Sequence, residues 1–318
     1  MYPLKVSAPL KDYLWGGKRL KTEYGFQSDS EIVAEAWVLS CRDDGESFVL
    51  NGELKGKSLR QAISVFGQDC LGKNAEKFPY FPLLIKLIDA KQKLSIQVHP
   101  DDEYALAHEG QFGKTEMWYV IDCAPSAKLI YGLQKTVTQE ELEQVIREDR
   151  ITEICHEVPV KKGDVFYIPS GTIHAIGEGI LIAEIQQNSN ITYRVSDYGR
   201  LGADGKPRML HREKALQVIT REPAPALDSE PGGIQAVSGC RERVLADCRY
   251  FSVKSLELDG RTERCVKDSF VSLLVLEGVC DFFWNGGNME LQKGDSLFIP
   301  AGLPFALDGK GQLLLSQV

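Results

Sequence analysis

The feature that most constrains how this chain can fold is an internal repeat. Residues 160–177 read VKKGDVFYIPSGTIHAIG and residues 291–308 read LQKGDSLFIPAGLPFALD. Aligned without gaps, they share Lys, Gly, Asp, Ile, Pro, Gly and Ala at matching positions. Gly-Asp favours a turn, because Gly adopts positive φ and Asp hydrogen-bonds the turn backbone, while Pro and Gly end the apolar strand that follows. A turn–strand–turn unit that occurs twice predicts two related β-domains.

Short apolar or alternating segments, separated by turn residues, recur along the chain and predict a mostly β protein. Helical patterns are fewer, and they lie at 58–67, 138–149 and 211–220. The Gly-Asp … Ile-Pro-x-Gly … His pattern of residues 163–174 resembles the second sequence signature of the cupin superfamily. That resemblance implies two cupin-type (jelly-roll) β-barrels with a few short helices.

A change of composition indicates where the two domains meet. Residues 222–233 read EPAPALDSEPGG, and a stretch so rich in Pro, Ser and Gly is typical of a linker or a long surface loop. We therefore expect a first domain over residues 1–221, the linker over 222–233 and a second domain over 234–318. The helical segments at 58–67 and 138–149 would be insertions in the first domain.

Composition limits the partners and the compartment. The formal net charge of −8 argues against nucleic acid and anionic membrane as partners, because both require clustered positive charge. The N-terminus lacks the apolar core of a signal peptide, and no run approaches the ~18 apolar residues that span a bilayer. Eight scattered cysteines without C-x-x-C spacing indicate free thiols, so we expect a cytoplasmic protein. The oligomeric state is left open.

Histidine is scarce and confined to the first two thirds of the chain, at positions 99, 108, 156, 174 and 211. In the repeat alignment His174 lies opposite Phe305. A looser alignment of EMWYVID (116–122) with VSLLVLE (271–277) places Glu116 opposite Val271. We infer that the first domain holds a polar site and that the second copy has lost it.

A metal site in the first domain is the chemistry that these residues favour. Gln97 and His99 lie two apart on an expected strand, so their side chains point to the same face. If that face is the interior, both can converge with Glu116 and His174 on a divalent ion, with zinc the first choice and manganese, iron or cobalt also suitable. A lone histidine on a strand is more often a hydrogen-bonded core residue, and Gln97 could instead hydrogen-bond a ligand. No metal role is assigned to the other histidines, at 108, 156 and 211.

The motifs that surround these residues resemble those of one enzyme family. They are QVHP (97–100), GKTE (113–116), GTIH (171–174) and NITYR (190–194). Together they resemble the type I mannose-6-phosphate isomerases of the short bacterial type. The resemblance implies a metal-dependent aldose–ketose isomerase that interconverts mannose 6-phosphate and fructose 6-phosphate, usually with zinc. Its partner is then a small phosphorylated sugar.

The same resemblance assigns roles by position. It implies metal ligands at Gln97, His99, Glu116 and His174, and active-site residues at Arg194, Lys114 and Lys86. The sequence departs from the family at Asn190, where many members carry an Asp that has been considered for proton transfer. We therefore expect another group to carry the proton, or Asn190 to serve as a hydrogen bonder.

The chemistry of such an isomerase agrees with these residue types. Moving a carbonyl between C1 and C2 passes through an enediolate, whose charge a divalent ion and a fixed arginine stabilise. Arg194 suits the second role because guanidinium stays charged and binds oxygens in a bidentate manner. The base is open between Lys114 and metal-bound water. For the phosphate, eligible cations are Arg194, Lys86, Arg200 and Arg208.

Two other functions are compatible with a cupin-like fold. One is a dioxygenase in which a metal held by His and Glu activates oxygen, although Q-x-H in place of H-x-H and the GKTE context argue against it. The other is a non-catalytic sugar-binding protein with two cupin domains, which Asn190 keeps open. Conversion of mannose 6-phosphate to fructose 6-phosphate separates the three.

Overall fold

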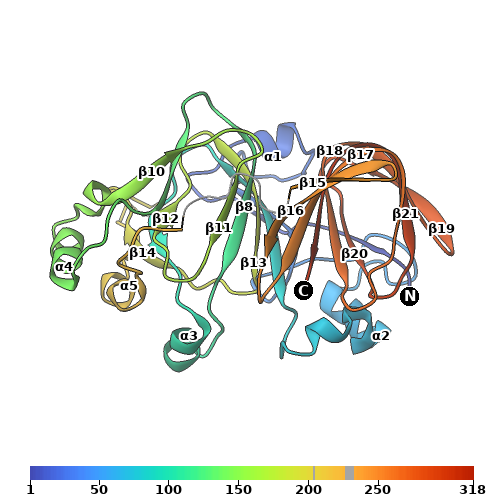
Figure 1. Ribbon diagram of the computed structural model, residues 1–318, viewed down its shortest axis with the longest axis horizontal. Helices are drawn as coiled ribbons and strands as arrows, with labels where there is room; N and C mark the ends of the chain where they lie inside the picture. The colour runs from blue at the N-terminus through green and yellow to red at the C-terminus, as the bar shows by residue number, and fades with distance from the viewer. Residues whose placement is uncertain (203–204, 226–232) are drawn as a thin grey trace.

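The computed structural model describes residues 1–202, 205–225 and 233–318, and the fold is mostly β (Figure 1). Its strands form four hydrogen-bonded sheets of eight, six, five and two strands. The two-stranded sheet is a hairpin of β4 (Cys41–Arg42) and β5 (Gly45–Glu46). The site lies between the six- and five-stranded sheets, as described below.

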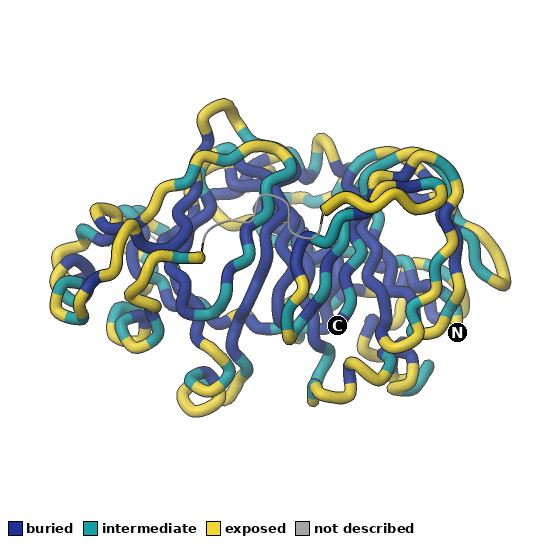
Figure 2. The backbone as a smooth tube through the Cα atoms, viewed as in Figure 1, coloured by how far each residue is buried: buried dark blue, intermediate teal, exposed yellow. Residues whose placement is uncertain are grey.

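The six-stranded sheet lies in the middle of the molecule (Figure 1). Its order is β11 (Val165–Ile168), β8 (Glu116–Cys123), β13 (Ile180–Gln187), β6 (Leu83–Ala90), β3 (Glu35–Leu39) and β2 (Leu10–Lys11). β13 and β6 are buried along their whole length because the sheet is covered on both faces (Figure 2). This double burial explains why both strands are almost continuously apolar rather than alternating.

The five-stranded sheet covers one face of the central sheet. Its order is β10 (Cys155–Pro159), β9 (Lys128–Leu133), β12 (His174–Ala175), β7 (Ile96–Val98) and β14 (Tyr193–Ser196). Apolar side chains from both sheets form one core cluster, which includes Trp118, Tyr131 and Phe166. The tyrosine hydroxyl also donates a 2.8 Å hydrogen bond to the Tyr167 carbonyl across the two sheets.

The eight-stranded sheet packs on the other face of the central sheet. It contains β1 (Leu4–Val6), β20 (Ser296–Ile299), β18 (Val271–Trp284), β21 (Phe305–Gln317), β17 (Ser252–Arg264), β16 (Cys240–Asp247), β15 (Ile234–Val237) and, paired with β18, β19 (Gly287–Gln292). A core cluster shared by the two sheets joins Met117 and Ile185 to Phe270 and Leu314. A second cluster lies within the eight-stranded sheet itself, around Phe282.

Helices are short and lie at the periphery (Figure 1). They are α1 (Arg19–Thr22), α2 (Leu59–Phe66), α3 (Asp102–Glu109), α4 (Gln139–Arg147) and α5 (Arg212–Val218), with 3-10 turns η1 (Gln68–Leu71), η2 (Lys73–Ala75) and η3 (Ile151–Glu153). The three helices expected at 58–67, 138–149 and 211–220 are confirmed. Ser58 caps α2 in a capping box with Gln61, and Thr138 accepts from the Glu141 N–H at the start of α4.

The internal repeat is confirmed as a structural repeat. β11 and β20 begin at the same offset in the two segments, and so do β12 and β21. The turn is also the same: Asp164 accepts a 2.9 Å hydrogen bond from the Lys161 N–H, and Asp295 accepts one of 2.9 Å from the Gln292 N–H.

The register between strands repeats as well, and it tests the alignment of residues 116–122 with residues 271–277. Glu116 pairs with Ile168 on β11, and Val271 pairs with Ile299 on β20. Val271 and Phe305 thus occupy the places of Glu116 and His174, which explains how the second copy lacks the polar site.

Two closed jelly-roll barrels, as expected from the cupin resemblance, are not confirmed. In the described part of the chain every sheet is an open path of strands, with β2 and β11 as the edges of the six-stranded sheet and β10 and β14 as those of the five-stranded sheet. The sheets meet through side chains, so packing replaces the hydrogen-bonded ladder that a closed barrel requires.

The division into residues 1–221 and 234–318 stays a prediction. Most of the expected linker, at 226–232, lies outside the described residues. One element crosses the division, because β1 near the N-terminus pairs antiparallel with β20.

Two further observations concern the thiols and the helices. All eight cysteines are free, and five of them are buried in the cores. Burial raises the pKa of Cys155 and Cys70 to about 12, so both thiols stay protonated. Over the three described stretches, no helix is both long and apolar enough to cross a bilayer.

The repeat's first glycine offers a test of the turn. Gly163 has φ of 88°, and a Cβ there would have no atom within 4 Å, so strain alone opposes a larger residue. We expect Gly163→Ala to lower the free energy of unfolding by about 1–2 kcal/mol. Gly163→Asn should cost clearly less, because Asn tolerates positive φ. Urea unfolding midpoints measure both, and equal midpoints for the alanine variant and the parent protein would contradict this view of the turn.

Candidate metal centre and its cavity

Three of the predicted site residues form one row across the five-stranded sheet. Gln97 on β7 is the direct partner of His174 on β12 and of Arg194 on β14. Residues directly opposite each other in antiparallel strands project to the same face. His99 follows the end of β7, and its carbonyl accepts a 2.8 Å hydrogen bond from the Gly171 N–H, which ties the two histidine-bearing segments together.

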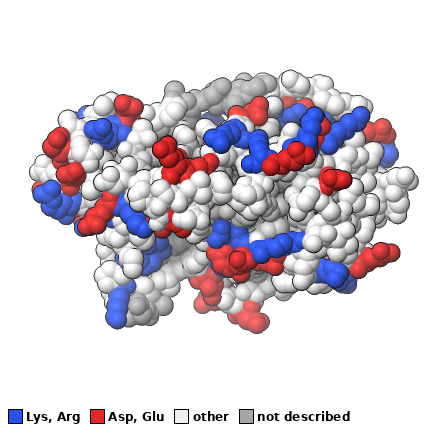
Figure 3. All heavy atoms as spheres, turned by 90° about the horizontal axis from the view of Figure 1, so that it is seen from below, with Lys and Arg blue, Asp and Glu red and all other residues white. Residues whose placement is uncertain are grey.

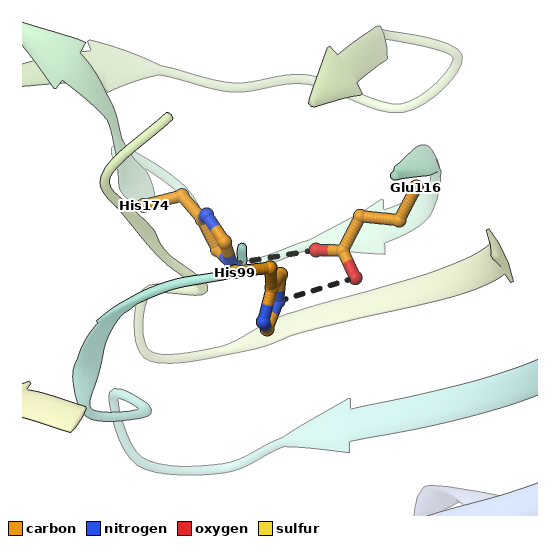
Figure 4. A group of neighbouring side chains, drawn as sticks. All are labelled: His99, Glu116 and His174. Atoms are coloured by element: carbon orange, nitrogen blue, oxygen red, sulfur yellow. Dashed lines mark ion pairs between the residues drawn. The ribbon is translucent and has the colours of Figure 1, made fainter. Parts of the chain in front are cut away.

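Glu116 reaches this row from the opposite sheet. It is the first residue of β8, and its carboxylate lies against both imidazole rings (Figure 4). Oε2 is 3.6 Å from His99 Nε2, and Oε1 is 3.4 Å from His174 Nε2. One ligand atom from each of the three residues lies within 4.8 Å of the others, and all three side chains are buried. The structure therefore brings together the two histidines and the glutamate that the sequence predicted.

The tautomers of both histidines are determined by backbone carbonyls. His99 Nδ1 is 2.8 Å from the Ile191 carbonyl oxygen, and His174 Nδ1 is 2.8 Å from that of Thr172. A carbonyl only accepts, so each Nδ1 carries the hydrogen and donates it. Each Nε2 then presents a lone pair to Glu116. Burial is the largest cause that lowers the pKa of both histidines, that of His99 to about 3, so both rings are neutral.

The two Nε2 lone pairs and the Glu116 carboxylate repel one another in this buried site, and a cation bound between them would remove that repulsion. Neither Glu116 oxygen accepts a well-formed hydrogen bond within the described chain, and His99 Nε2 has no hydrogen-bond partner there. Burying such groups unpaired costs free energy. Two imidazole nitrogens and a carboxylate are a ligand set for a borderline divalent ion, so the residues present fit a metal.

Gln97 stands at the edge of this cluster. Its side-chain amide nitrogen is 3.4 Å from His174 Nε2, and the residue is only half-buried. The amide oxygen and nitrogen differ little in shape, so a rotated amide would present its oxygen to the same centre. Gln97 is therefore placed either to complete the ligand set or to hydrogen-bond a ligand.

A row of buried charges continues from the cluster along the central sheet. Lys114 Nζ is 2.6 Å from Glu116 Oε2 and 3.7 Å from Glu184 Oε1. Lys86 Nζ lies 3.0 Å from Glu184 Oε1 and 3.9 Å from Glu35 Oε2. We call these five residues the charge row. Two lysines alternate with three glutamates, so each charge has an opposite neighbour, as buried charges require.

The charge row sets ionisation near the site. Burial alone raises the pKa of Glu116, but the ammonium of Lys114 outweighs it, so that pKa lies well below its ordinary value. Burial alone lowers the pKa of Lys86, but Glu184 and Glu35 raise it above its ordinary value. Both groups therefore stay charged at neutral pH.

Two members of the charge row, Glu184 and Glu35, were not predicted from the sequence. The Trp118 indole N–H donates to Glu184 at 2.9 Å, and the Trp37 indole N–H donates to Glu35 at 2.7 Å. Each glutamate interrupts an apolar strand, in ILIAEIQ and in AEAW. A carboxylate at a buried strand position is the signal that could have identified them.

A cavity of about 310 Å³ opens beside the cluster. Its lining includes the predicted residues Lys86, Gln97, Lys114, Asn190, Arg194 and Arg208, together with Glu184. A larger cavity, of about 690 Å³, lies near α2 and is lined by none of the predicted site residues. We place the candidate site in the smaller cavity because that cavity carries the convergent charges.

The remaining polar residues take distinct positions. Arg194 donates to the Ser95 hydroxyl at 3.3 Å and to the Met209 carbonyl at 2.8 Å. Asn190 is exposed at the cavity and donates to Asp44 at 3.0 Å. Arg200, one of the four cations eligible for the phosphate, is not part of the cavity lining. The histidines at 108, 156 and 211 lie outside the three-residue cluster, in agreement with the sequence analysis.

Comparison with protein families gives two matches. The family described as "Phosphomannose isomerase type I, catalytic domain" matches residues 3–115, and the one described as "Mannose-6-phosphate isomerase, cupin domain" matches residues 241–318. Among curated proteins, mannose-6-phosphate isomerase of Bacillus subtilis (strain 168) is 38% identical, and 99% of each chain is covered. Mannose-6-phosphate isomerase of Streptococcus mutans is 37% identical, over 99% of this chain and 98% of its own.

Solved structures agree with these matches. The crystal structure of mannose 6-phosphate isomerase from Bacillus subtilis superposes with a TM-score of 0.93 at 35% identity, over 100% of both chains. A mutant of phosphomannose isomerase from Salmonella typhimurium superposes with a TM-score of 0.80 at 19% identity, over 99% of both chains, which shows a shared fold.

The depressed pKa values predict how zinc binding depends on pH. Protons compete with a metal for the His99 and His174 nitrogens only near the pKa of those groups, and burial lowers the pKa of both. We expect the affinity for zinc to fall less than about tenfold from about pH 7.5 to about pH 5.5, whereas two ordinary histidines of pKa about 6.5 would lose about 100-fold. Competition with a chelator of known pH dependence measures this. A loss of zinc affinity of about 100-fold would show that both rings protonate with ordinary histidine pKa values.

Proposed function

The chain belongs to the type I mannose-6-phosphate isomerase family and is a mannose-6-phosphate isomerase, and we propose that it works with one divalent ion held by His99, Glu116 and His174. The observation that carries this proposal is the pair of buried Nε2 lone pairs directed at one carboxylate, which makes an ion pair with Lys114 but no well-formed hydrogen bond in the described part of the chain. The reaction interconverts mannose 6-phosphate and fructose 6-phosphate. No observation favours the dioxygenase or the non-catalytic alternative.

Zinc is the ion that we propose, with Gln97 as the fourth ligand. Three protein ligands from nitrogen and oxygen, with room for substrate, are typical of catalytic zinc sites. Gln97 supports this assignment by its place beside His174, in the same row of the sheet. Other divalent ions share the same ligand preferences, and the type of ion is tested by metal content.

The mechanism we propose divides the work among the residues of the cavity. When bound by His99, Glu116 and His174, a divalent ion would supply positive charge that stabilises the enediolate. Arg194 adds a fixed positive charge on the cavity wall, held in place by Ser95 and the Met209 carbonyl. Lys114, between Glu116 and Glu184, is our candidate for moving the proton between C1 and C2.

Lys86 stabilises the charge row through its ion pairs with two glutamates. It lines the cavity, but its ammonium is neutralised by Glu184 and Glu35. We therefore propose that Lys86 keeps Glu184 charged and fixes its position. As a cavity-lining residue, Lys86 is also placed to bind the sugar. Asn190 donates to Asp44 at the exposed rim, which supports a hydrogen-bonding role and not proton transfer.

We also propose that the two halves of the chain descend from one cupin-type (jelly-roll) unit, with domains over residues 1–221 and 234–318. Support comes from the repeated turn with its Asp hydrogen bond, the repeated register, and the cupin-domain match over residues 241–318. Eight unpaired cysteines support the cytoplasm as the compartment.

Ligand and non-ligand variants should separate metal binding from catalysis. Glu116→Ala and His174→Ala should weaken zinc binding by at least about 100-fold, since even indirect partners of ligands cost 10–100-fold. Both should lose turnover as a result. Arg194→Ala should retain full zinc and lose mainly turnover. Metal analysis after dialysis, together with an assay of fructose 6-phosphate formation, measures the two effects. Loss of zinc from the arginine variant would show that the roles are misassigned.

Lys114 has its own test. Lys114→Met should keep the zinc and lower kcat by about 100-fold or more, the range for a positioned acid or base. Lys162→Met is the matched control, because that lysine pairs with Glu277 on the surface and lies outside the cavity. A kcat within about tenfold of the parent enzyme, at full zinc, would exclude Lys114 as the proton carrier.

A further inference from the structure

Two arginines bind one buried carboxylate beside the cavity, and a third arginine lies close to them. Asp197, just after β14, is 5% exposed. It accepts two hydrogen bonds from Arg208, at 2.7 Å from Nε and 2.6 Å from a terminal nitrogen, and one of 2.8 Å from Arg200. Arg194 lies three residues before it on the same strand, close enough for both other arginines to act on its charge. We call these four residues the arginine cluster.

The arginine cluster carries an excess of positive charge. Within it, three guanidinium groups face a single carboxylate, although the whole chain has a net charge of −8. On the face drawn in Figure 3, by contrast, acidic and basic side chains lie near one another. Burial first and Arg208 next lower the pKa of Arg194 below its ordinary value, so the guanidinium groups repel one another. A bound anion would remove this repulsion.

Two arginines of the cluster have donors to offer such an anion. Arg208 uses Nε and one terminal nitrogen on Asp197, and its other terminal nitrogen has no partner in the described part of the chain. Arg194 likewise uses Nε and one terminal nitrogen on Ser95 and Met209. Both arginines line the 310 Å³ cavity that also contains Gln97 and Lys114.

The other cations near the cavity are less suited to bind an anion. Lys86 is buried between two carboxylates. Lys114 is 2.6 Å from Glu116. Arg200 donates to Asp197 and to the Lys93 carbonyl, and it does not line the cavity. After Arg194, Arg208 is therefore the cavity-lining cation whose charge is least neutralised, because it shares the carboxylate of Asp197 with Arg200.

We propose that Arg208, together with Arg194, binds the phosphate group of the sugar substrate, and that Asp197 is the positioning residue that holds Arg208 toward the cavity. This inference rests on the proposed function, since it assigns the phosphate of mannose 6-phosphate to one end of the same cavity. The reacting carbons C1 and C2 lie at the opposite end of the sugar from its phosphate. The two ends then meet different cations, the charge row at one and Arg208 at the other. Arg194 lies beside Gln97 in the row across the sheet and is close to Arg208, so its charge acts on both ends.

Kinetics with inorganic phosphate as a probe test the proposal on the zinc-loaded enzyme. Arg208→Ala should raise the KM for mannose 6-phosphate, and the inhibition constant of inorganic phosphate, by about 10–100-fold, the value of a charged hydrogen bond. Its kcat should change less than about threefold, because the lost contact acts on bound substrate and transition state alike. Arg212→Ala is the control, since Arg212 pairs with Asp149 outside the cavity, and it should change neither constant.

Asp197→Asn tests the positioning role. It keeps the shape of the side chain but loses its charge, so it should raise KM in the same direction as Arg208→Ala while kcat and zinc content stay unchanged. Arg208→Lys keeps a charge without the paired contact to Asp197, and it should fall between the parent enzyme and Arg208→Ala. If Asp197→Asn fails to fold, judged by its melting temperature, the two Arg208 variants still decide the proposal.

Two results would overturn it: unchanged KM and phosphate inhibition in Arg208→Ala, or a fall in kcat at unchanged KM. Calorimetric titration of phosphate into the parent protein separates this failure from that of the proposed function. Phosphate binding that Arg208→Ala abolishes, in a protein without isomerase activity at full zinc, would refute the isomerase mechanism and leave the anion site standing. An active parent enzyme whose phosphate binding is unaffected by Arg208→Ala would refute only the anion site.

Discussion

The candidate site depends on a repulsion between two buried lone pairs and a buried carboxylate, which Lys114 compensates only in part. His99 and His174 are locked by backbone carbonyls so that their lone pairs meet the carboxylate of Glu116 inside the protein. Four segments of the chain contribute to that arrangement. They are β7 and β12 from one sheet, β8 from the other, and the loop before β14, which supplies the Ile191 carbonyl. An arrangement so unfavourable for empty protein is what a cation-binding site needs, because the free energy of binding then offsets the burial of its ligands.

The charge row places further buried charges along the cavity wall, where they compensate one another. Glu116, Lys114, Glu184, Lys86 and Glu35 are all buried, and each contacts at least one opposite charge. Removing one member leaves its neighbours uncompensated, at a typical cost of about 3–5 kcal/mol. The charges of this wall therefore hold one another in place, and the groups that face the sugar are preorganised before it arrives. The arginine cluster differs, since its positive excess has no partner within the described protein.

Much of the site could be predicted from the sequence because its members sit in local patterns. The Q-x-H spacing put Gln97 and His99 on one face, and the repeat identified Glu116 and His174 by their apolar counterparts Val271 and Phe305. Glu184, Asp197 and the role of Arg208 were missed or left undecided because their meaning depends on strand pairing and on contacts between distant segments. Barrel closure failed as an expectation for the same reason: local strand patterns do not determine whether the edge strands of two packed sheets hydrogen-bond.

The pairing of β1 with β20 has a consequence for folding. Leu4 lies opposite Phe298, and Lys5 forms a 2.7 Å ion pair with Asp295, the aspartate of the second repeat turn. β1 thus pairs with a segment 290 residues further along the chain, although Val6 also bridges to Val49, which is much nearer in the sequence. Bringing β1 to β20 closes a long loop, and the conformational entropy that this costs grows with loop length. The pair therefore has a high contact order, and contacts of this kind are typical of slowly folding β proteins.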